Sequence, residues 1–480
     1  MFFRDLGPDV PSEVAAISTA VAQLADGLAS HGGCWSSGKM TLSCTDGSAT
    51  PPQVQECHGC GLFQAIPALT PGTTARCARC PTSLERATAH RLDQSIAFTA
   101  AALVLLIIMC ATTLMSVQTA GITLHAGLFS GPEELVHRGM AGLAAVVVFV
   151  TVIAPFGKLV GTLYVLIRLH EATPPHHLRR VFALAEKLRT WSMIEVFVFG
   201  VFVAYVKLGD LVQIGPDAGV FALLALTFVI IWTDSALDRE AIWDKLDRKD
   251  VTDETGRVAS LGRVPVGAVG CETCRLVSVP QHDHPSCPRC GSVLHARKPD
   301  SVARTWALVV AAAVLYVPAN LYPVLTVMQL GAGSPSTILG GVRELVSSHM
   351  YLLAALVFFA SVAVPMLKLV GLSVMLIATQ TGRAGWLRDR TRLYYIVRWI
   401  GRWSMIDIFM EALLGALVRF GTVVTIEPGI GAVSFCGVVI LTIFAAETFD
   451  PRLMWDRAAE RLAPGDPATL RILFRHELGA

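Results

Sequence analysis

Four Cys-x-x-Cys pairs are the residues whose types and spacing point most directly to chemistry in this sequence. The eight cysteines are Cys57, Cys60, Cys77 and Cys80 in the first half of the chain and Cys271, Cys274, Cys287 and Cys290 in the second half. Two such pairs close one tetrahedral zinc site, and separations of sixteen and twelve residues suit a small ribbon of short hairpins. We therefore predict two zinc ions, each held by four thiolates.

Four thiolates leave no open coordination position for water, so we expect structural sites and no enzymatic activity. A rubredoxin-like iron centre would use the same ligands and is the less favoured alternative. A redox-active dithiol needs only one pair, so it is disfavoured where four thiols occur in one small domain. We interpret His58, inside the first pair, as a turn residue rather than as a further ligand.

A second group of candidate residues is polar or charged and falls inside apolar stretches. An ionised side chain at mid-bilayer costs roughly 2.5–3.5 kcal/mol on insertion scales, so such residues are candidates for function. We expect pairs between neighbouring spans, either to lock the bundle or to take part in transport, although lysines near a span end can also snorkel to the interface. The candidates are Lys158, Glu195, Lys368, Asp407, Glu411, Asn320 and Glu447, with Lys158–Glu195 and Lys368–Asp407 as the expected pairs.

Pro155 and Pro365 precede the two lysines by three positions. A proline inside a helix removes the hydrogen bond to the carbonyl four residues back, so we expect a kink beside each lysine. A carbonyl released near a lysine would form an ion or headgroup site. The second half carries more polar residues inside its apolar stretches, which favours it as the working half.

The elements that must position these residues are membrane helices. The 480 residues are 53% hydrophobic and only 16% charged, against about 25% charged in soluble proteins. Apolar stretches near 20 residues are long enough to cross about 30 Å of hydrocarbon as helices. We predict an all-α polytopic protein with eight spans at residues 96–117, 140–167, 191–208, 220–237, 306–328, 351–378, 404–423 and 430–449.

The distribution of basic residues predicts the orientation in the membrane. Five lie between the second and third stretches and six between the sixth and seventh, whereas the loops 118–139 and 329–349 hold one arginine each. The positive-inside rule then places the basic loops, both termini and all four cysteine pairs in the cytoplasm. That compartment is reducing, which favours metal binding over disulfides. No cleavable signal peptide is visible in residues 1–33.

The chain is a tandem duplication with an offset near 210 residues. Trp191-Ser-Met-Ile-Glu195 matches Trp403-Ser-Met-Ile-Asp407, and a Pro-x-x-Lys-Leu-Val-Gly sequence occurs in both halves. We expect residues 11–29 to form an amphipathic helix and 30–52 a flexible linker. The predicted domains are an extension (1–56), a zinc ribbon (57–90), a membrane module (91–245), a linker (246–270), a second ribbon (271–298), a second module (299–456) and a C-terminal tail (457–480).

Together, the cysteine pairs, Pro-x-x-Lys-Leu and Trp-Ser-Met-Ile-Asp/Glu resemble the paraquat-inducible protein A family. The resemblance covers about Cys57 to Trp455 and excludes the N-terminal extension. It implies two modules, each a zinc ribbon followed by a tetraspanin-like bundle of four helices. It also implies a component of the bacterial inner membrane that moves phospholipids or other hydrophobic molecules toward the outer membrane, or back, with a periplasm-spanning MCE-domain partner, and so maintains the envelope.

Two other functional classes stay open on the residues alone. Parallel repeats also occur in ion-coupled transporters of small solutes, and the cysteine pairs would suit a membrane redox or metal sensor. The sequence has no Gly-x-x-x-x-Gly-Lys-Ser/Thr motif, so we expect no direct use of ATP by this chain. We also expect no nucleic-acid partner.

Overall fold

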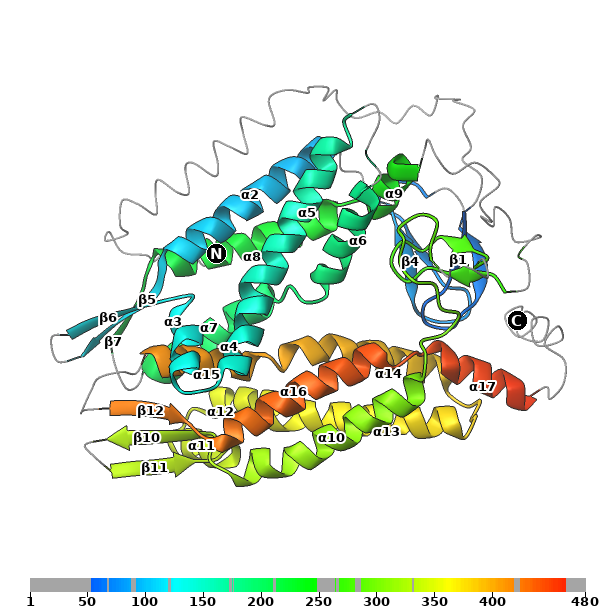
Figure 1. The fold of residues 1–480 in the computed structure, drawn as a ribbon. Helices are drawn as coiled ribbons and strands as arrows, with labels where there is room; N and C mark the ends of the chain where they lie inside the picture. The colour runs from blue at the N-terminus through cyan, green and yellow to red at the C-terminus, as the bar shows by residue number, and fades with distance from the viewer. Residues whose placement is uncertain are drawn as a thin grey trace, which may run out of the picture.

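The structure is a computed structural model of the chain. It describes residues 53–66, 69–87, 92–119, 122–171, 175, 177–209, 213–247, 264, 267–280, 286–329, 332–417 and 424–462. The predicted helix at 11–29 and the linker at 30–52 lie outside these residues, as does most of the predicted C-terminal tail. Figure 1 shows two groups of long helices, with a group of small hairpins at one end.

The first module is built from long apolar helices and one small sheet. The strands are β5 (Thr113–Thr119), β6 (Ile122–Gly127) and β7 (Gln213–Pro216), in the order β6-β5-β7. The helices are α2 (Leu92–Ala111), α3 (Ser130–His137), α4 (Ala141–Val148), α5 (Ala154–Arg168), α6 (His177–Arg189), α7 (Ile194–Gly209), α8 (Ala218–Ala236) and α9 (Arg239–Asp247).

The second module repeats this order of elements. Its strands are β10 (Leu325–Gln329), β11 (Ala332–Ser336) and β12 (Val424–Pro428), in the order β11-β10-β12. Its helices are α10 (Ser301–Leu321), α11 (Ile338–Ser347), α12 (Tyr351–Phe358), α13 (Val364–Gln380), α14 (Leu387–Trp403), α15 (Ile406–Leu417), α16 (Ile430–Thr448) and α17 (Arg452–Leu462). The match between the two modules bears out the predicted duplication.

Seven helices among the described residues are long and apolar enough to cross a membrane. They cover Asp93–Ala111, Ala141–Arg168, His177–Val206, Ala218–Ala236, Ser301–Leu321, Ala354–Gln380 and Ile430–Thr448. The predicted span 404–423 contains α15, a helix of 12 residues in its described part. The multi-pass architecture is therefore confirmed, and an eighth crossing stays a prediction.

A π-helical turn ends two positions before each of the two prolines. The turns are η1 (Phe149–Ile153) and η4 (Phe359–Ala363). The residue after each turn donates its N–H to a carbonyl five residues back, from Ala154 to Phe149 and from Val364 to Phe359. Such wide turns are a recognised cause of helix bending, so the α-helical ladder is interrupted where the sequence predicts it. The kinks themselves stay a prediction.

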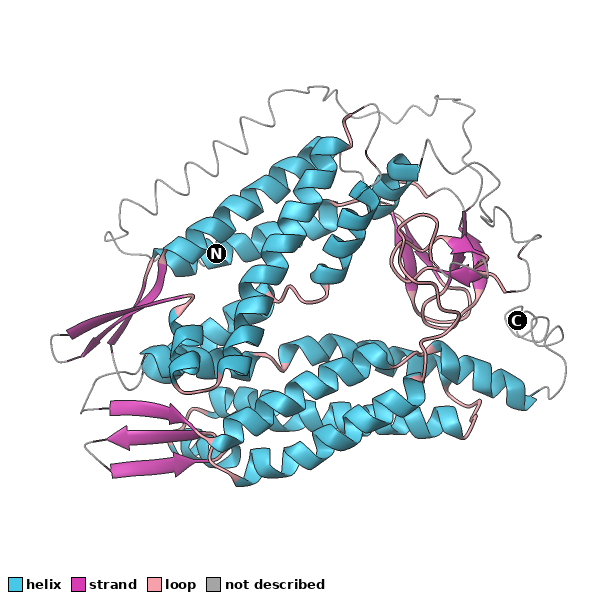
Figure 2. Cartoon of the chain, in the orientation of Figure 1, coloured by secondary structure: helices cyan, strands magenta, loops and turns pink. Residues whose placement is uncertain are grey.

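The first and fifth spans are shorter than predicted because their last residues form strands. Helix α2 ends at Ala111 and α10 at Leu321, and β5 and β10 follow. Hydropathy does not separate a strand from the end of an apolar helix, which explains the difference. Both sheets lie at the same end of the molecule, opposite the hairpins of the cysteine domains (Figure 2).

The two cysteine domains are made of short antiparallel hairpins, as predicted. The first contains β1 (Gln53–Glu56) with β2 (Phe63–Ile66), and β3 (Thr74–Arg76) with β4 (Ser83–Arg86). The second contains β8 (Val269–Gly270) with β9 (Val277–Ser278), and an isolated bridge between Ser286 and Val293. We call them ribbon 1 and ribbon 2.

Each ribbon packs its apolar side against the membrane module of the other half. The ribbon 1 cysteines share a buried cluster with residues of α13, α14 and α17, including Leu376, Tyr394 and Trp455. The ribbon 2 cysteines share a cluster with residues of α5, α6 and α9, including Phe182 and Trp243. Module 2 therefore contacts the first residues of the described chain, and the two halves are interlocked.

The modules also contact each other directly through their third long helices, α7 and α15. Phe197 and Phe409 meet edge to face with ring centroids 5.4 Å apart. At Gly200 the two helices approach so closely that a Cβ atom there would lie 2.8 Å from the Cβ of Phe409. One hydrophobic core extends across both modules as a result.

Candidate metal centres and membrane cavities

The eight paired cysteines form two buried clusters of four. In ribbon 1 the Sγ atoms of Cys57 and Cys80 are 3.4 Å apart, and those of Cys60 and Cys77 are 3.6 Å apart. In ribbon 2 the distances are 3.5 Å for Cys271–Cys290 and 3.4 Å for Cys274–Cys287. Four sulfurs at about 2.3 Å from one zinc ion stand about 3.8 Å from each other, so both clusters fit a tetrahedral metal.

Tight backbone turns bring the two cysteines of a pair together. The residue after the second cysteine donates its N–H to the carbonyl of the first in three pairs, from Gly61, Arg275 and Gly291. All three have positive φ, at 72°, 61° and 72°, which glycine tolerates and an arginine rarely adopts. Burial and the nearby Arg275 lower the pKa of His58 to about 3, and His58 belongs to neither group of candidate ligands.

The arginine before the last cysteine attaches each ribbon to the opposite module. The guanidinium of Arg79 lies 4.4 Å from the ring centroid of Trp455 in α17, within the range of a cation–π contact. Arg289 lies 6.0 Å from the ring of Trp243 in α9 and pairs with Asp244 at 3.0 Å and with Asp247. The Arg and Trp positions that the repeats share are therefore partners across the halves.

An ionic network joins the ribbons where they meet. Glu56 is buried and accepts hydrogen bonds from Gly270 N, Arg297 and Arg452. Arg452 also pairs with Asp450 at 2.9 Å. Burial alone would raise the pKa of Asp450, but the hydrogen bonds from Arg452 outweigh it and hold the pKa below its usual range. The charges are thus kept ionised in a buried place.

Lys158 has a different partner from the one expected. Its Nζ donates to Asp234 Oδ2 in α8 at 2.8 Å, rather than to Glu195. The Lys158 side chain is 7% exposed and that of Asp234 is 27% exposed. Glu195 lines the same small cavity as this pair. The expectation missed Asp234 because it lies at the end of a span that we treated as an apolar helix.

Lys368 is buried at the corresponding place in the second module. It is 1% exposed, and its Nζ donates to the Gly401 carbonyl at 3.2 Å and to Thr442 Oγ1 at 3.3 Å. Ala446 stands where the first module has Asp234. The side chains of Asp407 and Glu411 lie outside the described residues, so the pairing of Lys368 with Asp407 stays a prediction.

The other predicted polar residues have local partners. Asn320 donates to the Tyr316 carbonyl at 2.8 Å within α10. Glu447 forms a two-pronged ion pair with Arg398, with both contacts at 2.9 Å. Their roles in transport stay predictions, although Glu447 lies at the edge of a cavity.

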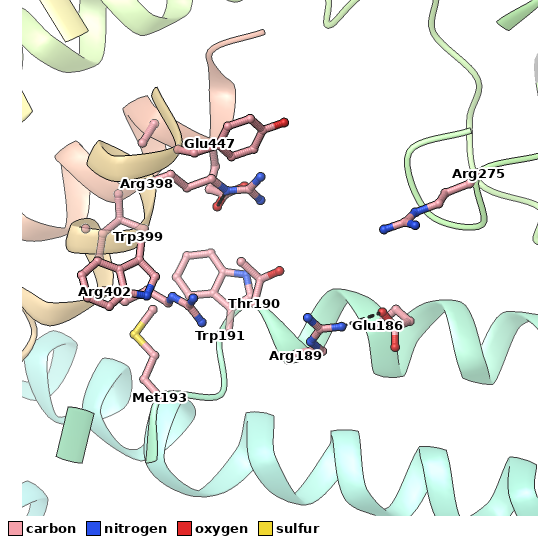
Figure 3. Close-up of a pocket in the computed structure, with 14 residues that line it drawn as sticks. Glu186, Arg189, Thr190, Trp191, Met193, Arg275, Arg398, Trp399, Arg402 and Glu447 are labelled. Carbon is pink, nitrogen blue, oxygen red and sulfur yellow. Dashed lines mark hydrogen bonds and ion pairs between the residues drawn. The ribbon is translucent and has the colours of Figure 1, made fainter. Parts of the chain in front are cut away.

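A cavity of about 570 Å³ lies where the two modules and ribbon 2 meet. Its lining includes four arginines (Arg189, Arg275, Arg398 and Arg402) and two glutamates (Glu186 and Glu447). Figure 3 shows these charged side chains around one open space, together with Trp191, Trp399 and Met193. A volume of this size is in the range of small-molecule sites.

A smaller cavity of about 190 Å³ is lined mostly by residues of the first module. It contains the Lys158–Asp234 pair and Glu195, and it shares Arg189 and Arg402 with the larger cavity. The two cavities therefore adjoin through these arginines. In the sequence, both arginines served only as evidence for the orientation in the membrane. Their repeated position just before Trp191 and Trp403 is the pattern that could have marked them as site residues.

Reciprocal aromatic contacts explain the duplicated Trp-Ser-Met-Ile motif. Trp191 of the first module lies 5.3 Å from Phe444 of the second, and Trp403 of the second lies 4.9 Å from Phe199 of the first. Each motif thus holds its own module against the other, next to the larger cavity.

Comparison with known proteins agrees with this architecture. The family model described as Paraquat-inducible protein A matches residues 92–247 and 302–459, which are the two membrane modules. No solved structure matches the chain significantly.

Relatives named as transport proteins match most of the chain. It is 34% identical to "Intermembrane transport protein PqiA" of Escherichia coli K12, over 84% of this chain and 96% of the relative. It is 29% identical to "Lipophilic envelope-spanning tunnel protein A" of the same strain, over 84% and 91%. It is 26% identical to "Probable intermembrane transport protein" of Haemophilus influenzae, over 85% and 97%. The chain is a multi-pass membrane protein with two four-cysteine clusters able to bind metal, and it belongs to the paraquat-inducible protein A family.

Proposed function

We propose that this chain is the inner-membrane component of an intermembrane lipid transport system. It moves phospholipids or other hydrophobic molecules between the inner and outer membranes with a periplasm-spanning MCE-domain partner. The names of its relatives support transport across the envelope. The chain itself carries no catalytic step in this proposal.

The observation that carries the proposal is the cavity between the modules. Its arginines and glutamates stand beside the apolar groups of Trp191, Met193 and Ile443. An amphiphile needs both kinds of wall, because its headgroup requires charged or hydrogen-bonding partners and its chains require apolar surface. The apolar part of the lining thus favours an amphiphile over a small polar solute.

The orientation and the metal belong to the same proposal. With the basic loops on the cytoplasmic side, the ribbons and both termini are cytoplasmic, and the two three-stranded sheets face the periplasm. Strands β6, β7, β11 and β12 are the edges of these sheets, and edge strands offer backbone groups to a partner. We propose that the MCE protein docks there, and that each ribbon holds one structural zinc ion.

Lipid transfer in a defined system tests the function. The full chain and its MCE partner are reconstituted between donor vesicles that contain fluorescent phospholipid and acceptor vesicles. We expect transfer that needs both proteins, and recovery of the MCE protein when the tagged chain is purified from membranes. Transfer at the same rate without the chain, or purification without an MCE protein, would refute the proposal.

A further inference from the structure

The larger cavity holds more positive than negative charge. Two of its four arginines pair with its two glutamates: Arg398 with Glu447 at 2.9 Å, and Arg189 with Glu186 at 3.5 Å. Glu186 is also shared with Arg239 at 3.0 Å. The cavity therefore has a net positive charge that a bound anion would neutralise.

Among the four arginines of the larger cavity, Arg402 forms the fewest side-chain interactions in the described part of the chain. Within the described part of the chain, its guanidinium has no hydrogen bond or ion pair. It lines both cavities and lies one residue before the motif tryptophan Trp403. Arg275, which enters from ribbon 2 (Figure 3), is held by a bond to the Leu84 carbonyl. That bond fixes the Arg275 side chain at the wall of the cavity.

The same space also suits an acyl chain, because apolar groups stand beside its arginines (Figure 3). Trp191, Ile443 and Ala446 line it, and Trp399 is 55% exposed on α14. Tryptophans of this kind collect at the boundary between headgroups and hydrocarbon. A lipid with its phosphate at the arginines would thus place its glycerol and upper chains among apolar groups.

We propose that this cavity binds the phosphate group of an anionic phospholipid, with Arg402 as its main ligand and Arg189 and Arg275 beside it. The guanidinium fork matches the oxygens of a phosphate and donates charge-assisted hydrogen bonds to them. The proposal rests on the proposed lipid transport and names the binding site for the headgroup. Free phosphate shares the same chemistry, so the test must separate the two sources.

Native mass spectrometry of the full chain in detergent provides the test. The protein is equilibrated with equal amounts of phosphatidylglycerol and phosphatidylcholine, with or without millimolar inorganic phosphate, and the retained lipids are counted. Arg402→Gln removes the charge, and Arg402→Lys keeps it without the fork. Arg392→Gln is the matched control, because Arg392 is exposed on the same helix and lies outside both cavities.

We expect the wild-type chain and Arg392→Gln to retain phosphatidylglycerol preferentially. Arg402→Gln should reduce that retention about tenfold or more, which is the usual effect of losing a charged hydrogen bond, and Arg402→Lys should restore part of it. Equal retention by Arg402→Gln and Arg392→Gln would overturn the proposal. Complete displacement of the lipid by inorganic phosphate would also overturn it, because the site would then bind a free anion.

The vesicle assay separates this inference from the proposed function. If lipid transfer occurs and Arg402→Gln retains phosphatidylglycerol normally, only the headgroup site is wrong. If phosphatidylglycerol binding depends on Arg402 but the chain and its partner transfer no lipid, the transport function is wrong and the site stands.

Discussion

Replacing Arg289 by methionine is the sharpest test of the interlocked ribbons. Arg289 belongs to ribbon 2, and its nearest carboxylate partners, Asp244 and Asp247, lie in α9 of the first module, with Glu240 of the same helix at 3.9 Å. Methionine keeps much of the side-chain volume and removes the charge. We expect ribbon 2 and α9 to separate more often, while ribbon 1 and α17 remain docked.

The expected size of the effect follows from the burial of the three side chains. Arg289 is 2% exposed and Asp247 is 5% exposed, and removing one partner of such a buried pair costs about 3–5 kcal/mol. Asp244 is 40% exposed and can be hydrated after the change, which favours the lower end, about 3 kcal/mol. Since each 1.4 kcal/mol is a factor of ten, opening should become about a hundredfold more frequent.

Hydrogen–deuterium exchange with mass spectrometry measures this opening in the full chain. The informative amides are those of α9 and those of the ribbon 2 turns, where Gly291 N donates to Cys287 O at 2.9 Å. Arg79→Met is the mirror variant. It should speed exchange in α17 by about fivefold or more, because the cation–π contact with Trp455 alone contributes about 1 kcal/mol.

The reasoning would be refuted if Arg289→Met accelerated exchange in α17 rather than in α9. That result would mean that ribbon 2 depends on its own module. Unchanged exchange in both helices would show that the Arg289 ion pairs do not hold the ribbon. Metal content is measured on the same samples, so that loss of the metal is not mistaken for undocking.

Three further predictions address the metal, the membrane pair and the junction. Elemental analysis of the purified chain should find two zinc ions. The variants Cys57→Ser and Cys271→Ser should each contain about one zinc ion fewer. Redox-active cysteines without metal would contradict this prediction. Lys158→Met should destabilise the chain by about 1–3 kcal/mol, because it leaves Asp234 without its cation. Size-exclusion chromatography should show less folded protein, and adding Asp234→Asn should restore part of that loss. No recovery in the double variant would argue against the pair. Gly200→Leu should lower the thermal unfolding midpoint by overpacking α7 against Phe409, at a cost of about 1–3 kcal/mol, and an unchanged midpoint would place the module junction elsewhere.

Local spacing predicted the two four-cysteine clusters correctly. A Cys-x-x-Cys pair fixes its own turn, and the second pair lies within the same small domain, so little long-range information is needed. The apolar helices were also predictable, because a membrane-spanning helix needs a long run of apolar residues. The same signal failed at Thr113 and Leu325, where β5 and β10 begin, because an apolar strand and the end of an apolar helix look alike.

The partners of the charged residues were not predictable in the same way. Asp234 is 76 positions from Lys158 in the chain, and only the packing of α8 brings it near. The cavity arginines come from α6, α14 and ribbon 2. Their meeting depends on how the two modules dock, which no local pattern encodes. Arg79 and Arg289, like Trp243 and Trp455, recur at matching places in the two halves, but this recurrence does not show that they contact each other across the halves.

The interlocked arrangement gives the metal clusters a role beyond their own domains. Each ribbon contacts the module of the other half, and the motif tryptophans repeat that exchange inside the bundle. Two like units that each bind the other in this way make reciprocal contacts, as the subunits of a two-fold dimer do. In this protein both units belong to one chain. Because Arg275 reaches the cavity from ribbon 2, we expect a change in ribbon docking to alter the charge in the cavity. The cysteine clusters are therefore connected to the cavity between the modules through the geometry of ribbon 2.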